Sequence, residues 1–272
     1  MYPQYRPSGF SLLPAVVKNL LIINGLMFLA QFVAEKAFGV RLEDMLGLHY
    51  PASMDFRPWQ FITYMFLHGD LMHVFFNMFA LWMFGYLLEN IWGPKRFLVF
   101  YFVTGIGAAL VQCLVMYIGI RPDLLLINQL INNPEPISVL NAFKGAQIPL
   151  GIRDALDKLM VVPDDKQSMI MVKNFLVEVK QSIIDGIPVV IGASGAVFGI
   201  LLAFGMLFPN TVIYLYFFFP VKAKYFVIGY GLLELYFGVS GTQSNVAHFA
   251  HLGGMVFGFF LILYWKKRGN LY

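Results

Sequence analysis

The stretch that decides the fold reads GASGAVFGILLAF and covers residues 192–204. Ser194 opens an apolar run that predicts a helix, and small residues recur every four positions at Gly195, Gly199 and Ala203. Residues four apart lie on one face of a helix. This ridge of small residues therefore predicts a close approach by another helix, as happens inside membranes. The free backbone N–H groups and positive dipole end at a helix start favour developing negative charge beside Ser194.

The composition predicts an all-α, polytopic membrane protein. Of 272 residues, 59% are hydrophobic and 12% are charged, whereas a soluble domain has about 25% charged residues. The net charge of +4 is not gathered on one amphipathic face, which argues against a nucleic-acid partner. The single cysteine, Cys113, excludes an intramolecular disulfide and a thiolate metal cluster. The first apolar run has no persuasive cleavage site, so we expect it to be an uncleaved span.

Six apolar runs approach the ~20 residues that cross a bilayer. We predict spans at residues 13–33, 68–88, 97–120, 194–208, 225–239 and 245–265. Residues 211–219 are β-branched and aromatic, and they predict either an interfacial strand-like segment or the beginning of the fifth span. We treat residues 1–272 as a single membrane domain.

A charged segment, residues 121–188, interrupts the apolar pattern between the third and fourth spans. Its apolar residues recur at helical spacing from Met169 to Ile184. This spacing predicts an amphipathic helical insertion that lies on the membrane surface. We expect the insertion to modulate substrate access or to bind a partner.

Basic residues gather at the same ends of the predicted spans. With six spans, one side of the membrane receives Arg6, Lys18, Lys95, Arg96, Lys222, Lys224 and residues 266–268. The positive-inside rule makes that side cytoplasmic. Both termini are then cytoplasmic, while the insertion and Ser194 lie at the outer face. Because no transit peptide is evident, we expect a multi-pass protein of a bacterial plasma membrane.

A histidine in the last span shares a helix face with two glycines. His251, Gly254 and Gly258 follow at i, i+3 and i+7, so they give this face the small surface needed to dock on the ridge behind Ser194. His251 lies 15 residues before Lys266, which is about 22 Å along a helix. The docking and the depth both predict that His251 lies beside Ser194.

The second span begins with two further polar side chains on one face, His73 and Asn77. Acyl transfer at a serine needs a base for the hydroxyl and donors for the oxyanion. Ser194, His251 and these two donors form such a set. It contains no carboxylate, and we expect a neighbouring ring, Phe198, to fix the imidazole.

Three other polar residues receive structural interpretations. We expect Glu234 in the fifth span to make a structural hydrogen bond, His248 to be a lining or interfacial residue, and His68 to brace the first loop. Intramembrane polar residues are costly and usually have a partner or a function.

The motifs together resemble the rhomboid intramembrane serine proteases. The resemblance rests on Gly192-x-Ser194-Gly195, on Ala250-His251-x-x-Gly254-x-x-x-Gly258, and on His68-x4-His73-x3-Asn77. It implies a six-helix rhomboid-like bundle with Ser194 as nucleophile and His251 as base. It also implies an oxyanion hole of His73, Asn77 and the Ser194 backbone N–H, with Phe198 packed on the catalytic histidine and with Gly192, Gly195, Gly199, Gly254, Gly258 and His68 in support.

The implied function is an intramembrane serine endopeptidase that cleaves transmembrane segments of single-span proteins near the outer surface of the lipid bilayer. No cofactor, metal or particular oligomeric state is implied. The sequence departs from the family at Gln60, where the family's first loop has an arginine, and in the length of the insertion. The alternative functions are an inactive rhomboid-like chaperone or trafficking factor, and a zinc site built from His68, His73, His248 and His251.

Overall fold

The computed structural model describes residues 10–215, 218–241 and 246–269. Arg6, which entered the charge argument, and residue 245, the expected start of the sixth span, lie outside the described residues. The chain divides into two compact units. One comprises Met1–His49, Phe56–Leu114 and Val189–Tyr272, and the other comprises Tyr50–Asp55 and Val115–Pro188.

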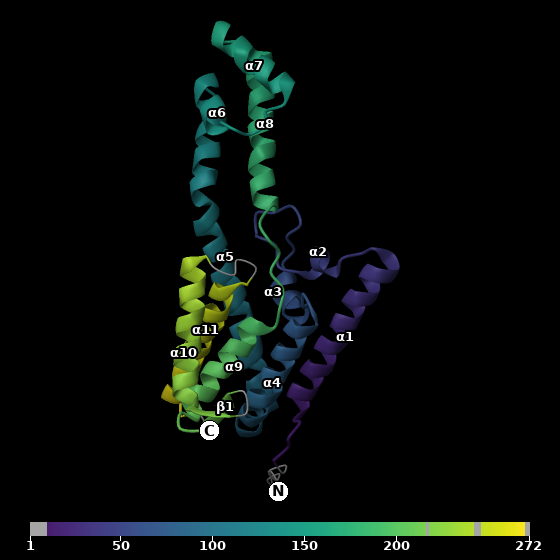
Figure 1. Ribbon diagram of the computed structural model, residues 1–272, viewed down its shortest axis with the longest axis vertical. Coiled ribbons are helices and arrows are strands. Elements are labelled where there is room, and N and C mark those ends of the chain that lie inside the picture. Colours follow the sequence, from purple (N-terminus) through teal and green to yellow (C-terminus); the bar gives the residue numbers. More distant parts are fainter. Residues whose placement is uncertain (1–9, 216–217, 242–245, 270–272) are drawn as a thin grey trace. The chain divides into compact units, whose positions relative to one another are not determined.

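The predicted spans correspond to helices α1 (Ala15–Phe38), α4 (Leu71–Trp92), α5 (Pro94–Asn132), α9 (Ser194–Leu207), α10 (Ala223–Ser240) and α11 (His248–Lys267) (Figure 1). In the described part of the chain, four of these, α1, α4, α5 and α11, are long and apolar enough to cross a membrane, and α9 is a shorter apolar helix. The fold is therefore a polytopic helical membrane bundle, as predicted.

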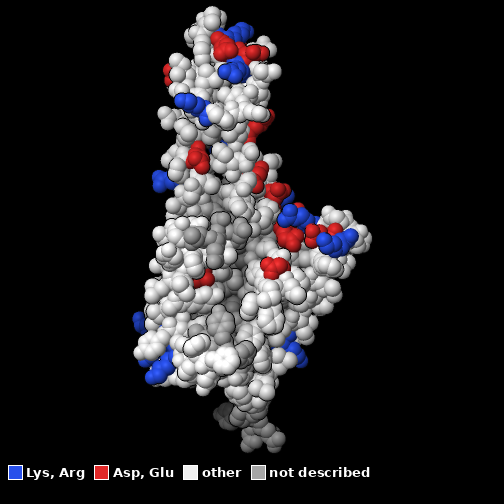
Figure 2. Space-filling view, in the orientation of Figure 1, with Lys and Arg blue, Asp and Glu red and all other residues white. Residues whose placement is uncertain are grey.

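The surface of the first unit suits a hydrocarbon environment. Large apolar side chains are exposed on α1 and α4, among them Leu26, Leu29, Phe32, Phe75 and Phe76. Figure 2 shows that in this view charged residues are sparse over the body of these helices and gather near the end of α1 that adjoins α2. A contiguous apolar surface of this kind marks a membrane contact.

Helix α9 is the central helix of the first unit. Ten of its fourteen residues are buried, and it contacts α4, α10 and α11. Its apolar character on all sides is what a helix enclosed by other helices requires. Ser194, its first residue, is thereby placed at one end of the packed core.

Helices α9 and α11 approach each other through glycine, as predicted: Gly254 lies against Gly195, and a Cβ atom added to Gly258 would lie 3.5 Å from Cα of Gly199. A Cβ atom added to Gly254 of α11 would overlap the backbone carbonyl of Gly195. The side-chain positions of the α9 glycines point toward α5: a Cβ atom at Gly195 would overlap Ala108, and one at Gly199 would lie 2.6 Å from Thr104. The glycines of α9 thus allow α5 to pack closely against α9, and Gly254 allows the α9 backbone to pack closely against α11.

The connection between α1 and α4 contains two short helices, α2 (Leu42–Leu46) and α3 (Gln60–Thr63), followed by the 3₁₀ turn η1 (Tyr64–Phe66). Gln60 is fully buried. Its side-chain oxygen accepts from the backbone N–H groups of His49 (3.3 Å) and Arg57 (3.1 Å), and its amide donates to the carbonyl of Met45 (3.3 Å). The neutral Gln60 side chain therefore ties this loop together at the position where the resemblance implied an arginine.

The same connection holds the segment that leads into Ser194. Leu48 and Val190 exchange two backbone hydrogen bonds of 2.9 and 3.0 Å, and the Gly192 N–H donates to the carbonyl of Tyr64 (2.9 Å). Backbone pairing on both sides fixes the approach to the start of α9.

A short antiparallel hairpin follows α9. Strands β1 (Val212–Leu215) and β2 (Phe219–Lys222) pair with Val212 opposite Lys222. The strand-like interpretation of residues 211–219 is therefore correct for the described part of that segment, and the next helix begins only at Ala223.

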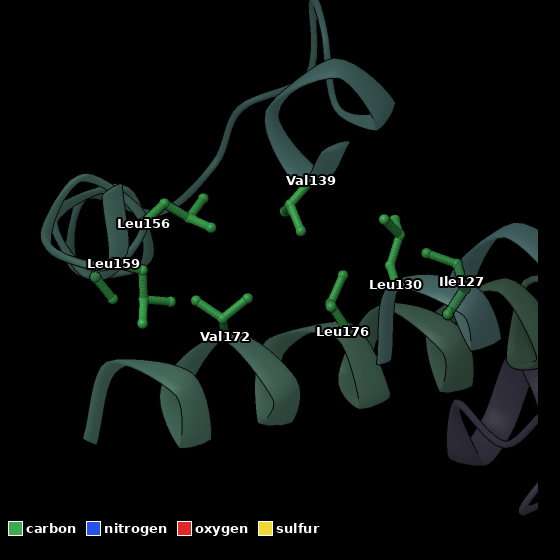
Figure 3. Packing of buried hydrophobic residues seen from close by; sticks show 8 residues of the cluster. Ile127, Leu130, Val139, Leu156, Leu159, Val172 and Leu176 are labelled. Atoms are coloured by element: carbon green, nitrogen blue, oxygen red, sulfur yellow. The ribbon is translucent and has the colours of Figure 1, made fainter. Parts of the chain in front are cut away.

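The second unit contains the helices α6 (Pro136–Ala142), α7 (Leu150–Val161) and α8 (Lys166–Asp185) together with the C-terminal part of α5. The predicted helix around residues 169–184 is confirmed. Its buried residues Val172 and Leu176 pack with Ile127, Leu130, Val139, Leu156 and Leu159 (Figure 3). The apolar face that was expected to lie on the membrane surface is thus covered by helices of its own unit.

Local sequence sets the ends of these helices. Asp165 caps α8 by accepting from the Ser168 N–H (2.9 Å) and pairs with Lys158 at 2.8 Å. Hydrogen bonds from Lys158 and Ser168 hold the pKa of Asp165 far below its usual value.

The helix predicted to end at residue 120 instead continues through Pro122 to Asn132, because Ile127 and Leu130 beyond the proline are buried in the core of the second unit.

We expect Gly254→Ala to lower the stability of the protein in detergent by about 1–3 kcal/mol, the usual cost of overpacking. The added methyl group must displace the Gly195 backbone, so α9 and α11 must separate. The measurement is the thermal unfolding midpoint. Gly25→Ala in α1 is the matched control, since a Cβ atom there has nothing within 4 Å. Equal midpoints for the two variants would contradict the packing argument.

Candidate active site

Ser194 and His251 lie in hydrogen-bond contact. The Oγ atom of Ser194 is 2.7 Å from Nε2 of His251. Ser194 begins α9, and His251 lies in the first turn of α11 and is 8% exposed. The contact follows from the glycine packing of these helices. Gly254 lies against the backbone of Gly195, and the carbonyl of Ala250, the residue before His251, lies 3.6 Å from a Cβ atom added to Gly195.

Phe198 holds the imidazole of His251 from one side. The two rings are stacked, with centroids 4.3 Å apart and planes inclined by 5°. The ring of Tyr230 from α10 packs against Phe198 in turn, with centroids 4.9 Å apart. Since Phe198 follows Ser194 by one helical turn, the same helix supplies the hydroxyl and the surface that orients its partner.

A carboxylate, which the sequence analysis did not assign to this site, contacts the far side of His251. The Oε2 atom of Glu234 in α10 is 2.8 Å from Nδ1 of His251 and 2.7 Å from Nδ1 of His248. Glu234 and His248 are each 5% exposed. The hydrogen bond expected for Glu234 is present, and His248, expected to be a lining or interfacial residue, is buried beside the candidate dyad.

A signal for this carboxylate was present in the sequence. An acidic residue within an apolar span must find a partner or a function. The sequence did not reveal which face of α10 turns toward α11, so the partner remained unassigned.

His73 presents an N–H group beside Ser194. The Gly69 N–H donates to Nδ1 of His73 (3.3 Å), so Nδ1 is the acceptor and Nε2 carries the hydrogen in the neutral ring. A Cβ atom added to Gly192 would lie 2.9 Å from His73 Nε2 and 3.5 Å from Ser194 Oγ. The donor and the hydroxyl therefore border the same small space, which Gly192 keeps open.

Asn77 lies one turn after His73 on α4 and is buried. Its amide donates to the carbonyl of His73 (3.0 Å), and an amide nitrogen has a second hydrogen to offer. At the start of the same helix, Asp70 caps α4 by accepting from the backbone N–H of His73 (2.8 Å).

His68 precedes α4 and is braced by its backbone. The side chain of Gln31 accepts from the His68 N–H (3.0 Å) and donates to the His68 carbonyl (3.1 Å). The His68 ring lies edge-on to that of His73, with centroids 5.0 Å apart. Burial, together with the neighbouring His73, lowers the pKa of His68 to about 3, so His68 is neutral near pH 7.

The described residues contain one group of three side chains with metal-ligand atoms close together. Glu234, His248 and His251 place these atoms within 4.8 Å of one another. The separations of 2.7 and 2.8 Å are those of hydrogen bonds, and we interpret the group as a hydrogen-bonded cluster. His68 and His73 do not join it, so the four-histidine zinc site considered from the sequence is not formed.

A family model described as a Rhomboid domain matches residues 55–118 and 168–268, which is more than half of the chain. The unmatched stretch between these segments falls within the second unit.

Several curated proteins are similar to the chain. An uncharacterized mitochondrial rhomboid protein of Schizosaccharomyces pombe is 28% identical over 91% of this chain and 64% of its own length. Rhomboid protease GlpG of Haemophilus influenzae is 29% identical over 35% of this chain and 50% of its own length. A protein of Arabidopsis thaliana named inactive RHOMBOID-like protein 8 is 37% identical over 25% of this chain and 20% of its own length.

The chain thus spans less than two thirds of the length of each of these relatives. Mitochondrial and bacterial names both occur among them, so they do not support the specific assignment to a bacterial plasma membrane. The named proteins include a protease and an inactive protein. The matched family model and the helical membrane bundle agree, and the chain belongs to the rhomboid family.

Proposed function

We propose that the protein is an intramembrane serine endopeptidase that works by a Ser–His pair. The observation that carries the proposal is the 2.7 Å contact between Ser194 Oγ and His251 Nε2 at the start of α9. A serine whose hydroxyl touches an imidazole held by a third group is the arrangement of an activated nucleophile.

In the proposed reaction, Ser194 Oγ attacks the carbonyl carbon of the scissile peptide bond while His251 Nε2 takes the hydroxyl proton. The resulting oxyanion accepts hydrogen bonds from His73 Nε2–H, the Asn77 amide and the Ser194 backbone N–H. His251 then gives its proton to the leaving amine, and water hydrolyses the acyl-enzyme. Donors fixed in advance in a site of low polarity stabilise such an oxyanion strongly.

The proposed substrates are transmembrane segments of single-span membrane proteins. A helix must open its backbone hydrogen bonds before a carbonyl is exposed to attack, so we expect helix-breaking and small residues near the cleavage site. The basic residues Lys95, Arg96, Lys266 and Lys267 support cytoplasmic termini, with Ser194 near the outer face. We also retain the proposal that residues 121–188 form an insertion within one rhomboid-like membrane domain.

The second candidate is an inactive rhomboid-like chaperone or trafficking factor, because one relative is named inactive. Such a protein has no need of a hydroxyl in contact with an oriented imidazole. The stacked Phe198 and the 2.7 Å contact favour the enzyme.

Ser194→Ala and His251→Ala should each abolish cleavage of a single-span model substrate in detergent or vesicles, because each removes one member of the pair. Both variants should keep the thermal midpoint of the wild type to within a few degrees. A metal chelator should leave wild-type cleavage unchanged, and a fluorophosphonate should label wild type at Ser194 only. Normal turnover by Ser194→Ala would end the proposal.

His73→Ala and Asn77→Ala should each raise the barrier by about 2–4 kcal/mol, as expected for loss of an oxyanion donor. The effect should appear in kcat, since the hydrogen bond strengthens only as charge develops. Asn90→Ala is the matched control on the same helix: Asn90 bonds the carbonyls of Ser11 and Tyr86, away from Ser194. A rate loss as large in the control would show that α4 was damaged as a whole.

Gly192→Ala should greatly reduce fluorophosphonate labelling of Ser194. Its φ of +128° is rarely open to alanine, and its Cβ atom would lie 2.9 Å from His73 Nε2. Gly93→Ala separates the two effects, because Gly93 has a φ of +76° and nothing within 4 Å of an added Cβ atom. We expect the control to lose stability but to keep its labelling rate. Equal labelling of both variants and wild type would rule out a role for Gly192 in the site.

A further inference from the structure

We propose that Glu234 is a positioning residue for His251, so that the site works as a Ser194–His251–Glu234 triad whose carboxylate is held in place by His248. The inference rests on the proposed function and deepens it. It assigns a role to a buried acid and a second histidine that a Ser–His pair alone does not use.

The hydrogen bonds to Glu234 determine the tautomer of His251. An ionised carboxylate only accepts hydrogen bonds, and a single oxygen, Oε2, lies 2.8 Å from His251 Nδ1. Nδ1 of His251 therefore carries a hydrogen. In the neutral ring this leaves a lone pair on Nε2, which faces the Ser194 hydroxyl at 2.7 Å. The carboxylate thus places the basic nitrogen of His251 at the nucleophile.

The same oxygen also accepts from Nδ1 of His248 at 2.7 Å. The second donor limits rotation of the carboxylate and offsets part of the cost of burying its charge. His248 and His251 lie three residues apart at the start of α11, so they present both N–H groups to α10 from one helix face. His248 therefore contributes to the site without touching Ser194.

The position of Glu234 beside His251 Nδ1 affects both proton transfers of the proposed reaction. As the Oγ–C bond forms, the Ser194 proton moves to His251 Nε2 and the ring becomes an imidazolium. The Nδ1 hydrogen stays on the ring, and the negative Glu234 stabilises the positive charge across the 2.8 Å hydrogen bond. When the C–N bond breaks, the Nε2 proton passes to the leaving amine, so the ring returns to its starting tautomer.

Burial strengthens the argument that Glu234 is more than a packing residue. An ionisable side chain inside an apolar span costs several kcal/mol unless its partners compensate. Glu234 lies in α10 between Leu233 and Leu235, which are exposed on the surface of the bundle, while Glu234 itself is 5% exposed. A leucine would pack at such a position at less cost, so its occupation by an acid calls for a role that needs a charge.

The test compares Glu234→Gln with Glu89→Gln. Glu89 is also a buried carboxylate with two hydrogen bonds, which it accepts at 2.8 Å from the backbone N–H groups of Val16 and Val17, but it touches neither Ser194 nor a histidine. We expect Glu234→Gln to reduce kcat by about 100-fold or more, with little change in KM. Glu89→Gln should lower the thermal midpoint without a comparable loss of kcat.

A second readout does not depend on catalysis. In protein labelled with 15N-histidine, the His251 Nδ1–H bonded to a carboxylate should give a low-field proton resonance. We expect this resonance in wild type and in Glu89→Gln, and its loss in Glu234→Gln. Its persistence in Glu234→Gln would overturn the inference, as would unchanged kcat in that variant.

The outcomes separate the inference from the proposed function. If wild type neither cleaves a substrate nor reacts with a fluorophosphonate, the proposed function fails, while the resonance still tests the Glu234–His251 bond. If Glu234→Gln does not fold, His248→Asn decides: it keeps the carboxylate but removes its second donor, and it should lower kcat and shift the resonance. Wild-type kcat and an unshifted resonance in a folded His248→Asn protein would overturn the inference.

Discussion

The close approach of α9 and α11 is the constraint on which the rest of the site depends. At Gly254 the backbone of α9 occupies the space that a side chain on α11 would need. No larger residue fits there without moving the carbonyl of Gly195. His251 lies one turn before this contact and Ser194 one residue before Gly195. A displacement of about one methyl group would lengthen the 2.7 Å contact beyond hydrogen-bond reach. The geometry of the candidate site is therefore set first by the absence of side chains at Gly195 and Gly254.

Much of this arrangement could be predicted from spacing alone. The apolar runs predicted the helices, and polar residues that break apolar runs drew attention to Ser194, His251 and His73. The direction of each glycine ridge could not be predicted, because helical period shows which residues share a face but not which neighbour that face meets. The contact between the two glycine-bearing faces was predicted correctly, but the close approach of α5 to the side-chain positions of Gly195 and Gly199 was not. Glu234 was left without its partners for the same reason.

The insertion shows a different limit of pattern reading. Helical spacing from Met169 to Ile184 correctly indicated a helix with one apolar face. A membrane surface and a set of companion helices make the same demand on such a face, so the pattern could not choose between them. The companion helices α6 and α7 are short, and they become recognisable as part of a core only once Val139, Leu156 and Leu159 are brought together with α8 (Figure 3).

The rhomboid family includes both proteases and inactive proteins, so the contacts of the candidate site must decide between these two functions. A serine hydroxyl in contact with a stacked imidazole favours a protease. A buried carboxylate with two histidine donors points the same way, because it costs stability wherever it is not needed. The low polarity that makes Glu234 expensive also strengthens its hydrogen bonds and keeps water from competing for Nδ1 of His251. The low polarity of the bundle is therefore the reason both that the Glu234 charge is costly to bury and that its hydrogen bond orients the imidazole of His251 strongly.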